Sequence, residues 1–599
     1  MSDAVSVLSD PQHAVKLLRS LSSFRGDALF CDACLVLEGQ EIPVPKSILA
    51  AASPYIRTKL NYNPPKDDGS IYRIELEGIS FAIMKEILDY IFSGQIRLSD
   101  ETIQDVVQAA DLLLLTDLKT LCCEFLERCI AAENCIGIRD FALHYCLNHV
   151  HYIATEFLET HFRDVSNTEE FLELNHQKVK EVISLEKLNV GNERHVFEAV
   201  VRWISHDPEE RKVHMKDVTS ALWVAGLDSS YLRERMMNEP LVREIIKECS
   251  NIPLSQPQQG EALLASFKPR GYSECIVTVG GEDRVSRDPT AVVRCMCPLY
   301  DRNRQLWIEL APMSCPRINH GVLSAEGFVF VLGGQDDKKE TLCSGEKYDP
   351  DTNTWTPLPP MVEARHNFGM VEIDGVIYIL GGEDGDTELI SMESYDISTK
   401  TWSTQPDLTM VRKIGCYAAM KKKIYAMGGG SYGKLFESVE SYDPKTQQWT
   451  AICPLKERRF GAVACGVGLE LYVFGGVRSR DNDNQNSEMV ACKSEFYHDE
   501  FKRWIYLNDQ NLCIPTSSSF VYGAVPIGAS IYVIGDLDTG TNYDYIREFK
   551  RSTGAWNHTK PLLPSDLRRT GCAALRIANC KLFRLQLQQG LFRIRVPSP

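Results

Sequence analysis

The stretch VIYILGGEDGDTELISMESYDISTKTW, residues 376–402, decides the fold, because its pattern returns throughout the C-terminal half of the chain. An apolar run ends in Gly381-Gly382, an aromatic residue follows at Tyr395, and a tryptophan comes seven residues later at Trp402. The other copies keep the same aromatic spacing in the pairs Tyr300 and Trp307, Tyr348 and Trp355, Tyr442 and Trp449, Tyr497 and Trp504, and Phe549 and Trp556. A fixed period of about 50 residues indicates a repeat architecture in which each copy is one structural unit.

This period and its Gly-Gly pair resemble the Kelch repeat, which forms one four-stranded blade of a β-propeller. Six copies therefore predict a six-bladed, all-β propeller over residues 271–599. The segment 571–577 lacks a complete blade after it, and the segment that starts near Tyr272 lacks an inner strand before it. We expect these two segments to pair, because their pairing closes the ring and removes open sheet edges. The tail Asn579–Pro599 receives no assignment.

Two sets of loops are expected to meet at one mouth of the propeller channel. The residue two positions before each inner-strand glycine should project toward that mouth, which gives Asn319, Asn367, Lys413, Arg459, Val521 and Arg569. The residues directly after the first three Gly-Gly pairs should lie on neighbouring loops: Glu282, Asp283, Gln335, Asp336, Glu383 and Asp384. We interpret both sets as a target-binding face on which basic groups stand opposite acidic ones. The alternative is that these are solvated loop charges, since exposed charge pairs are usually weak.

The N-terminal half divides into two further predicted domains. Residues 30–37 alternate as a strand, and a helix at 46–52 is followed by Ser53-Pro54, which is a start signal for another helix. A later helix carries the apolar stripe Ile103, Val106, Val107, Ala110 and Leu114. This order resembles the α/β BTB domain, expected over 1–130, and the run 134–142 resembles the opening of an all-α BACK domain, expected over 131–249. Residues 250–270 are rich in proline and glutamine and are interpreted as a linker.

BTB, BACK and six Kelch repeats in this order resemble the family of substrate adaptors for Cullin-3 ubiquitin ligases. The resemblance implies a homodimer formed through the BTB domain, no catalytic activity of its own, and targets that are cytoskeletal, such as intermediate-filament or microtubule-associated proteins. It also implies a cytoplasmic, cytoskeleton-associated location. The alternative is a dimeric cytoskeletal scaffold or cross-linker that recruits no ligase.

The resemblance to this family places the cullin contact just after the helix that Ser53-Pro54 begins. The family often has an apolar-x-Glu motif there, whereas this chain has Lys66 where the glutamate would fall. The contact is therefore expected to use nearby apolar groups such as Tyr62 and Leu113.

Composition excludes several other classes of function. The formal net charge is -16, so the chain lacks the excess of basic residues that binding to nucleic acids or anionic membranes requires, and we expect neither as a direct partner. No apolar run approaches the ~18 residues of a membrane span. The loop Gly428–Leu435 resembles a phosphate-binding loop but lacks the Ser or Thr that holds magnesium, and Cys31 and Cys34 lack a second pair of zinc ligands. We therefore expect no metal and no cofactor.

Overall fold

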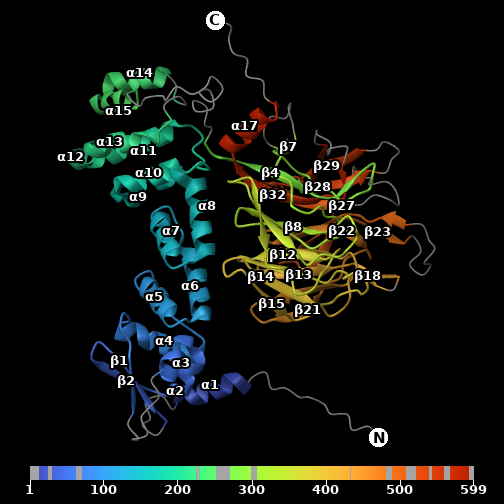
Figure 1. Cartoon of the computed structure of the whole chain (residues 1–599), viewed down its shortest axis with the longest axis horizontal. Coiled ribbons are helices and arrows are strands. Elements are labelled where there is room, and N and C mark those ends of the chain that lie inside the picture. Colours follow the sequence, from blue (N-terminus) through green and yellow to red (C-terminus); the bar gives the residue numbers. More distant parts are fainter. Residues whose placement is uncertain are drawn as a thin grey trace. The chain divides into compact units, whose positions relative to one another are not determined.

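The structure is a computed structural model, and it describes residues 13–23, 30–62, 71–223, 227, 229–250, 270–298, 307–431, 433–479, 489–507, 521–537, 543–558 and 567–591. The chain forms two compact units. The first comprises Met1–Leu158 with Thr168–Glu170, and the second comprises Glu159–Asn167 with Phe171–Pro599. Figure 1 shows the helices of the N-terminal half in blue to green and the strands of the C-terminal half in yellow to red.

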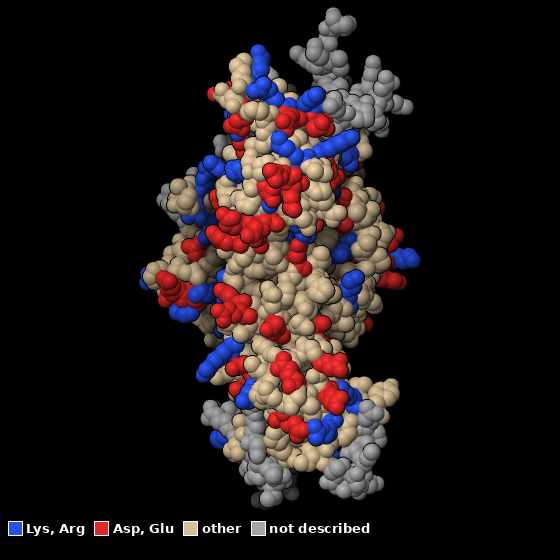
Figure 2. Space-filling model, turned by 90° about the vertical axis from the view of Figure 1, so that its left-hand side faces the viewer, with Lys and Arg blue, Asp and Glu red and all other residues tan. Residues whose placement is uncertain are grey.

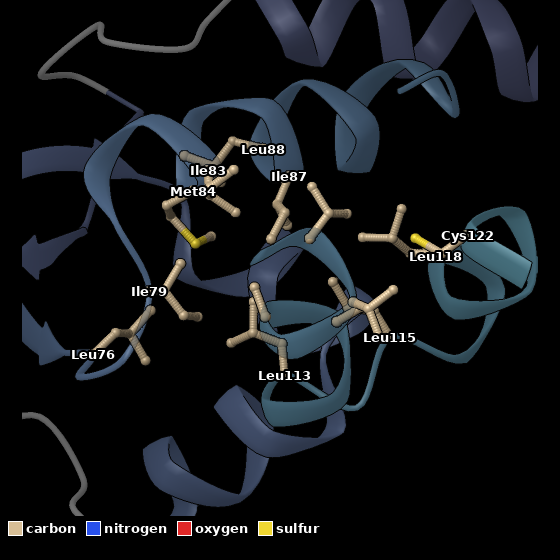
Figure 3. Packing of buried hydrophobic residues seen from close by; sticks show 14 of the residues in the cluster. Leu76, Ile79, Ile83, Met84, Ile87, Leu88, Leu113, Leu115, Leu118 and Cys122 are labelled. Carbon is tan, nitrogen blue, oxygen red and sulfur yellow. The ribbon is translucent and has the colours of Figure 1, made fainter. Parts of the chain in front are cut away.

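The first unit surrounds a small mixed sheet with helices. The sheet has the order β2-β1-β3, in which β1 runs antiparallel to β2 and parallel to β3. Its elements are α1 (His13–Ser23), β1 (Ala33–Leu37), β2 (Gln40–Val44), α2 (Lys46–Ala52), α3 (Pro54–Tyr62), β3 (Tyr72–Glu75), α4 (Phe81–Ser93), α5 (Ile103–Leu112), α6 (Thr116–Cys129), α7 (Cys135–His144) and most of α8 (Asn148–Val165). The core shown in Figure 3 joins α4, α5 and α6 around residues such as Ile83, Ile87 and Leu118.

Ser53 explains how two parts of this unit are held together. Its hydroxyl accepts a hydrogen bond from the Ile56 amide at 3.2 Å, which caps the N-terminus of α3. The same hydroxyl donates to the Leu113 carbonyl at 2.6 Å, directly after α5 ends. The predicted helix start at Ser53-Pro54 is therefore confirmed, and the buried Ser53 links α3 to the turn between α5 and α6.

The second unit begins with short helices. They are α9 (Glu169–Glu173), α10 (His176–Ser184), α11 (Arg194–His206), α12 (Pro208–Arg211), the 3-10 helix η1 (Lys212–His214), α13 (Met215–Thr219), α14 (Ser229–Asn238) and α15 (Pro240–Ser250). Helix α11 buries an apolar stripe that includes Phe197, Val200 and Trp203. Among the helices that the structure describes, none combines the length and the apolar character needed to cross a membrane.

The rest of the second unit is the predicted propeller, whose described strands form five four-stranded sheets and one sheet with a fifth strand. Blade one contains β32 (Gly571–Ala578), β4 (Tyr272–Val279), β6 (Val293–Met296) and β7 (Ile308–Glu309), and the short β5 (Glu282–Asp283) pairs with β31 (Leu567–Arg568). Blade two contains β8 (Gly321–Ala325), β9 (Phe328–Leu332), β10 (Gly345–Asp349) and β11 (Thr354–Leu358). Blade three contains β12 (Gly369–Ile373), β13 (Val376–Leu380), β14 (Met392–Asp396) and β15 (Thr401–Gln405).

The remaining three blades depart more from a uniform pattern. Blade four contains β16 (Cys416–Met420), β17 (Lys423–Met427), β20 (Val439–Asp443) and β21 (Gln448–Ile452), with the small hairpin β18 (Gly430–Ser431) and β19 (Lys434–Leu435). Blade five contains β22 (Phe460–Val467), β23 (Glu470–Ser479), β25 (Glu495–His498) and β26 (Arg503–Tyr506), with the added strand β24 (Met489–Ala491). Blade six contains β27 (Val521–Ile527), β28 (Ser530–Leu537), β29 (Tyr543–Lys550) and β30 (Ala555–His558).

The ring closes as the sequence predicts. Strand β32 pairs antiparallel with β4 over eight residues, from Gly571 opposite Val279 to Ala578 opposite Tyr272. The last segment of the repeat region therefore supplies the inner strand of the first blade. The residues that follow form helix α17 (Asn579–Gln588), for which no prediction had been made.

The repeated aromatic residues pack and form hydrogen bonds between neighbouring blades. Tyr395 and Trp402 face each other across β14 and β15, with ring centroids 5.0 Å apart. The indole nitrogen of Trp402 donates to the Pro359 carbonyl of the preceding blade at 2.9 Å, and Trp449 donates to Pro406 at 3.1 Å in the same way. The prediction that these residues belong to the packing of the fold is confirmed for these pairs, whereas Tyr300 lies outside the described residues.

Candidate functional site

Four blades share a buried ion pair that fixes the loops of the predicted mouth. Arg317, Arg365, Arg412 and Arg459 each donate from Nη1 to the carbonyl of the first glycine in a Gly-Gly pair, always at 2.9 Å. Each guanidinium also contacts a glutamate on the third strand of its own blade, namely Glu346, Glu393, Glu440 and Glu495. These arginines therefore build the loops and do not offer their charge to a partner.

The prediction that Arg459 projects toward the mouth is therefore wrong. Its side chain is 0% exposed and lies against Glu495, which is equally buried. The error arose because the position was counted back from the nearest glycine, and in this repeat that glycine, Gly461, comes two residues after the buried arginine. Counting forward from the buried arginine gives the correct register.

The residue two positions after the buried arginine adopts a left-handed conformation. Asn319, Asn367 and Ile414 have φ angles of 56°, 54° and 49°, and Arg569, which follows the buried Leu567 by two residues, has a φ angle of 52°. The Asn367 amide donates to the Asn319 carbonyl at 3.0 Å, which links neighbouring blades. Asn319, Asn367 and the exposed Arg569 share this conformation and stay predicted mouth residues, whereas in blade four it is Ile414, and not Lys413, that adopts it. Val521 opens β27, and its side chain lies outside the described residues.

The predicted acidic residues are largely engaged within the loops themselves. Glu282 is buried and contacts Arg568 at 3.2 Å, so the prediction that it faces a partner is wrong. The carboxylate of Asp384 accepts backbone amides of Thr387 and Asp386, and these hydrogen bonds hold its pKa below the usual range. Asp283 has a lowered pKa for the same reason, through the amides of Ser286 and Val285.

Asp336 follows the same loop pattern, because its carboxylate accepts the amides of Lys338 and Glu340 at 2.9 Å each. Gln335 accepts a hydrogen bond from the Asn319 side chain at 3.4 Å. Lys413 is exposed and forms an ion pair with Glu383 at 3.0 Å. The acidic and basic groups at this mouth therefore include a direct pair, and the two sets do not stand apart as we expected.

Sequence analysis missed the exposed apolar side chains on the same loops. Val285 is 92% exposed on the loop that follows Gly281, and Val362 is 72% exposed on the loop that enters β12. Ile390 and Met410 are also exposed on loops at this end of the propeller. No repeat position identifies these residues, because they differ in type from blade to blade.

The first unit presents a second candidate surface. Tyr62 is 81% exposed at the end of α3, as an interface residue requires, whereas Lys66 lies outside the described residues. Leu113 is 0% exposed and points into the core in Figure 3, so the prediction that it contacts a cullin is wrong. Its neighbour Leu114 is 54% exposed and has a φ angle of 55°. Figure 2 shows Lys and Arg side chains intermixed with Asp and Glu side chains over the described part of the face that it presents.

Three family models match the chain in the predicted order. They are the BTB/POZ domain at residues 21–130, "BTB And C-terminal Kelch" at residues 135–237, and the KLHDC2/KLHL20/DRC7 Kelch-repeats domain at residues 271–476. The structure of the BTB domain of human gigaxonin is 74% identical and covers 20% of this chain and 98% of that chain, with a TM-score of 0.19.

Curated relatives match nearly the whole chain. Gigaxonin from Mus musculus and gigaxonin from Homo sapiens are each 88% identical over 594 residues, which is 99% of this chain and 99% of the relative. Kelch-like protein 2 from Rattus norvegicus is 31% identical over 54% of this chain and 55% of its own length. The chain therefore belongs to the gigaxonin family of BTB–BACK–Kelch proteins.

Proposed function

We propose that this protein is a non-catalytic substrate adaptor that binds a target on its propeller and recruits a Cullin-3 ubiquitin ligase through its first unit. The observation that carries the proposal is the combination of BTB, BACK and Kelch domains in one chain with exposed large apolar residues on the first unit. We further propose that the protein acts in the cytoplasm on cytoskeletal proteins, such as intermediate-filament or microtubule-associated proteins.

Exposed apolar groups support the cullin contact. Tyr62 and Leu114 are large, exposed and attached to elements that the Ser53 hydroxyl joins. Aromatic and aliphatic anchors supply most of the binding energy at protein interfaces, so the contact does not depend on a glutamate at position 66. Exposed Leu17 and Leu18 on α1 similarly support a homodimer through the BTB domain.

The adaptor function is tested by mixing the full chain with the N-terminal domain of Cullin-3 and measuring co-elution and affinity. We expect Leu114→Glu and Tyr62→Glu each to weaken binding at least tenfold. Val213→Glu is the matched control, since Val213 is 80% exposed on the second unit. Failure of the unmodified chain to bind would leave the cytoskeletal scaffold as the better reading of the same domains.

The target-binding face is tested separately. Lys413→Glu and Arg569→Glu reverse two exposed charges at the mouth, and Val362→Asp removes an exposed apolar side chain. We expect these variants to lose capture of a cytoskeletal target while Cullin-3 binding is unchanged. Arg459 is unsuitable for this test, because a glutamate there would face the buried Glu495.

A further inference from the structure

Helix α17 is attached to the propeller along its apolar side. Leu582 is buried, and Leu585 and the following Leu591 pack against the same cluster as Val293 and Ile308 of blade one. The side-chain amide of Gln589 makes two hydrogen bonds with the backbone of Glu309, at 3.0 Å and 2.7 Å. Gln589 thus completes the outer edge of the blade at β7, as a neighbouring strand would.

The first residue of α17 joins the propeller to the segment before it. The Asn579 side chain accepts from the Ser273 hydroxyl at 2.6 Å and donates to the Arg270 carbonyl at 3.1 Å. Its backbone amide donates to the Gly271 carbonyl at 2.9 Å, and the Gly271 amide donates to the backbone carbonyl of Glu186 at 2.9 Å. Gly271 has a φ angle of 89°, and a Cβ there would approach the Leu188 carbonyl to 3.5 Å.

A four-membered charge network extends this connection. Lys581 of α17 contacts Asp351 of blade two at 2.9 Å and Glu186 at 3.6 Å. Lys187 contacts the same aspartate at 3.4 Å. Burial disfavours the charged form of Asp351, but Lys187 and Lys581 outweigh it and lower its pKa. A network of several charges is a better stabilising arrangement than an isolated surface pair.

Arg270, the residue before Gly271, connects the start of the propeller to the helices of the second unit. Its guanidinium forms an ion pair with Glu193 at 2.8 Å and donates to the Ala221 carbonyl at 2.6 Å. Both charged side chains are buried, at 10% and 5% exposure. The Glu193 carboxylate also accepts the Trp223 amide at 3.2 Å. The start of the propeller is therefore anchored in the helices of the second unit.

We propose that α17 is a clasp that holds the propeller against the segment 185–193, between helices α10 and α11 of the same unit. The apolar side of the helix binds blade one, Lys581 contacts Glu186 of the segment 185–193, and Asn579 binds Arg270 and Gly271, whose backbone amide donates to the Glu186 carbonyl. The clasp keeps a target on the propeller at a fixed angle to the BACK helices. That consequence rests on the proposed adaptor function, whereas the clasp itself does not.

Hydrogen exchange measured by mass spectrometry on the full chain tests the clasp. We expect Lys581→Glu to raise exchange at least fivefold in peptides covering 186–193 and the amide of Gly271, because the new carboxylate faces Glu186 and Asp351. Asn579→Ala should raise exchange at Gly271 in the same direction, since it removes the side-chain hydrogen bonds to Ser273 and Arg270 that hold the start of the propeller next to Glu186. Exchange in β13 and β17 should not change in either variant.

Two control variants separate the clasp from a general effect on stability. Arg584→Glu makes the same change of charge at an exposed position on α17 and should leave exchange at 186–193 unchanged. Lys581→Arg keeps the cation and should behave like the unmodified chain. Unchanged exchange at 186–193 in Lys581→Glu would overturn the clasp. Equal loss of protection across β4, β32 and 186–193 would also overturn it, because α17 would then only stabilise blade one.

Discussion

Replacing Arg365 with methionine removes one member of a fully buried ion pair while keeping an unbranched side chain of similar length. The Arg365 side chain is 0% exposed and contacts Glu393, which is 4% exposed, at 2.6 Å. It also donates to the carbonyls of Gly381 at 2.9 Å and Ser391 at 3.1 Å. The substitution leaves a buried carboxylate without its cation and two carbonyls without this donor.

The expected cost follows from the burial of that carboxylate. Removing one partner of a buried ion pair costs about 3–5 kcal/mol, because the remaining charge is left uncompensated. Unfolding a propeller of roughly 300 residues has an entropy of about 0.6 kcal/mol per kelvin, at about 2.1 cal/mol/K per residue. The Tm of the propeller should therefore fall by about 5–8 °C.

Scanning calorimetry of the full chain measures this shift, with hydrogen exchange in β13 and β14 identifying the propeller transition. Lys413→Met is the matched control, since its pair with Glu383 is exposed and should be worth about 1 kcal/mol or less. The double variant Arg365→Met with Glu393→Leu should recover part of the loss, because it leaves no buried charge. A decrease of less than 2 °C in Arg365→Met, measured to about 1 °C, would refute the reasoning.

Two further predictions concern single positions in the propeller. Gly466→Ala should destabilise blade five by more than about 3 kcal/mol, because a Cβ would lie 1.9 Å from the Ala419 carbonyl oxygen. Gly468→Ala should cost only about 1–2 kcal/mol, because Gly468 has a φ angle of 63° but lies in open space. Chemical denaturation of both variants checks this order of stabilities. Burial lowers the pKa of His320 from 6.5 to about 4, so the folded state favours the neutral imidazole. The contribution of His320 to the free energy of unfolding is therefore fully present above pH 6.5 and is lost as the pH falls toward 4. His320→Gln should remove about 3 kcal/mol of that pH dependence in thermal unfolding, and an unchanged slope would contradict it.

The repeat could be predicted from the sequence because its signals are local. The aromatic pair lies across one hairpin, as Tyr395 and Trp402 do, and the Gly-Gly pair lies at a strand end. Ring closure could also be predicted, since an inner strand without a blade and a blade without an inner strand are complementary. Helix α17 could not, because its anchors Asn579 and Gln589 bind backbone groups that only the closed ring brings near.

The site residues depended on register, which the sequence leaves open. Arginine precedes four of the inner strands and a glycine follows it, but only the arginine has a fixed role, through its glutamate on the third strand. In the repeats that contain Arg412 and Arg459, the glycine is nearer to the arginine than in the others, so counting from it moved the assignment by one or two residues. An assignment anchored on the Arg–Glu pair would have placed Ile414 at the mouth and Arg459 in the interior.

Leu113 and Leu114 show why burial at a helix end is difficult to predict. The apolar stripe of α5, continued with helical periodicity, puts Leu114 in the core. The helix instead ends at Leu112, and the Leu113 carbonyl accepts the Ser53 hydroxyl, which holds that residue inward. Leu114 then adopts a φ angle of 55° and turns its side chain to the surface. A contact between chain segments 60 residues apart thus decides which leucine can meet a partner.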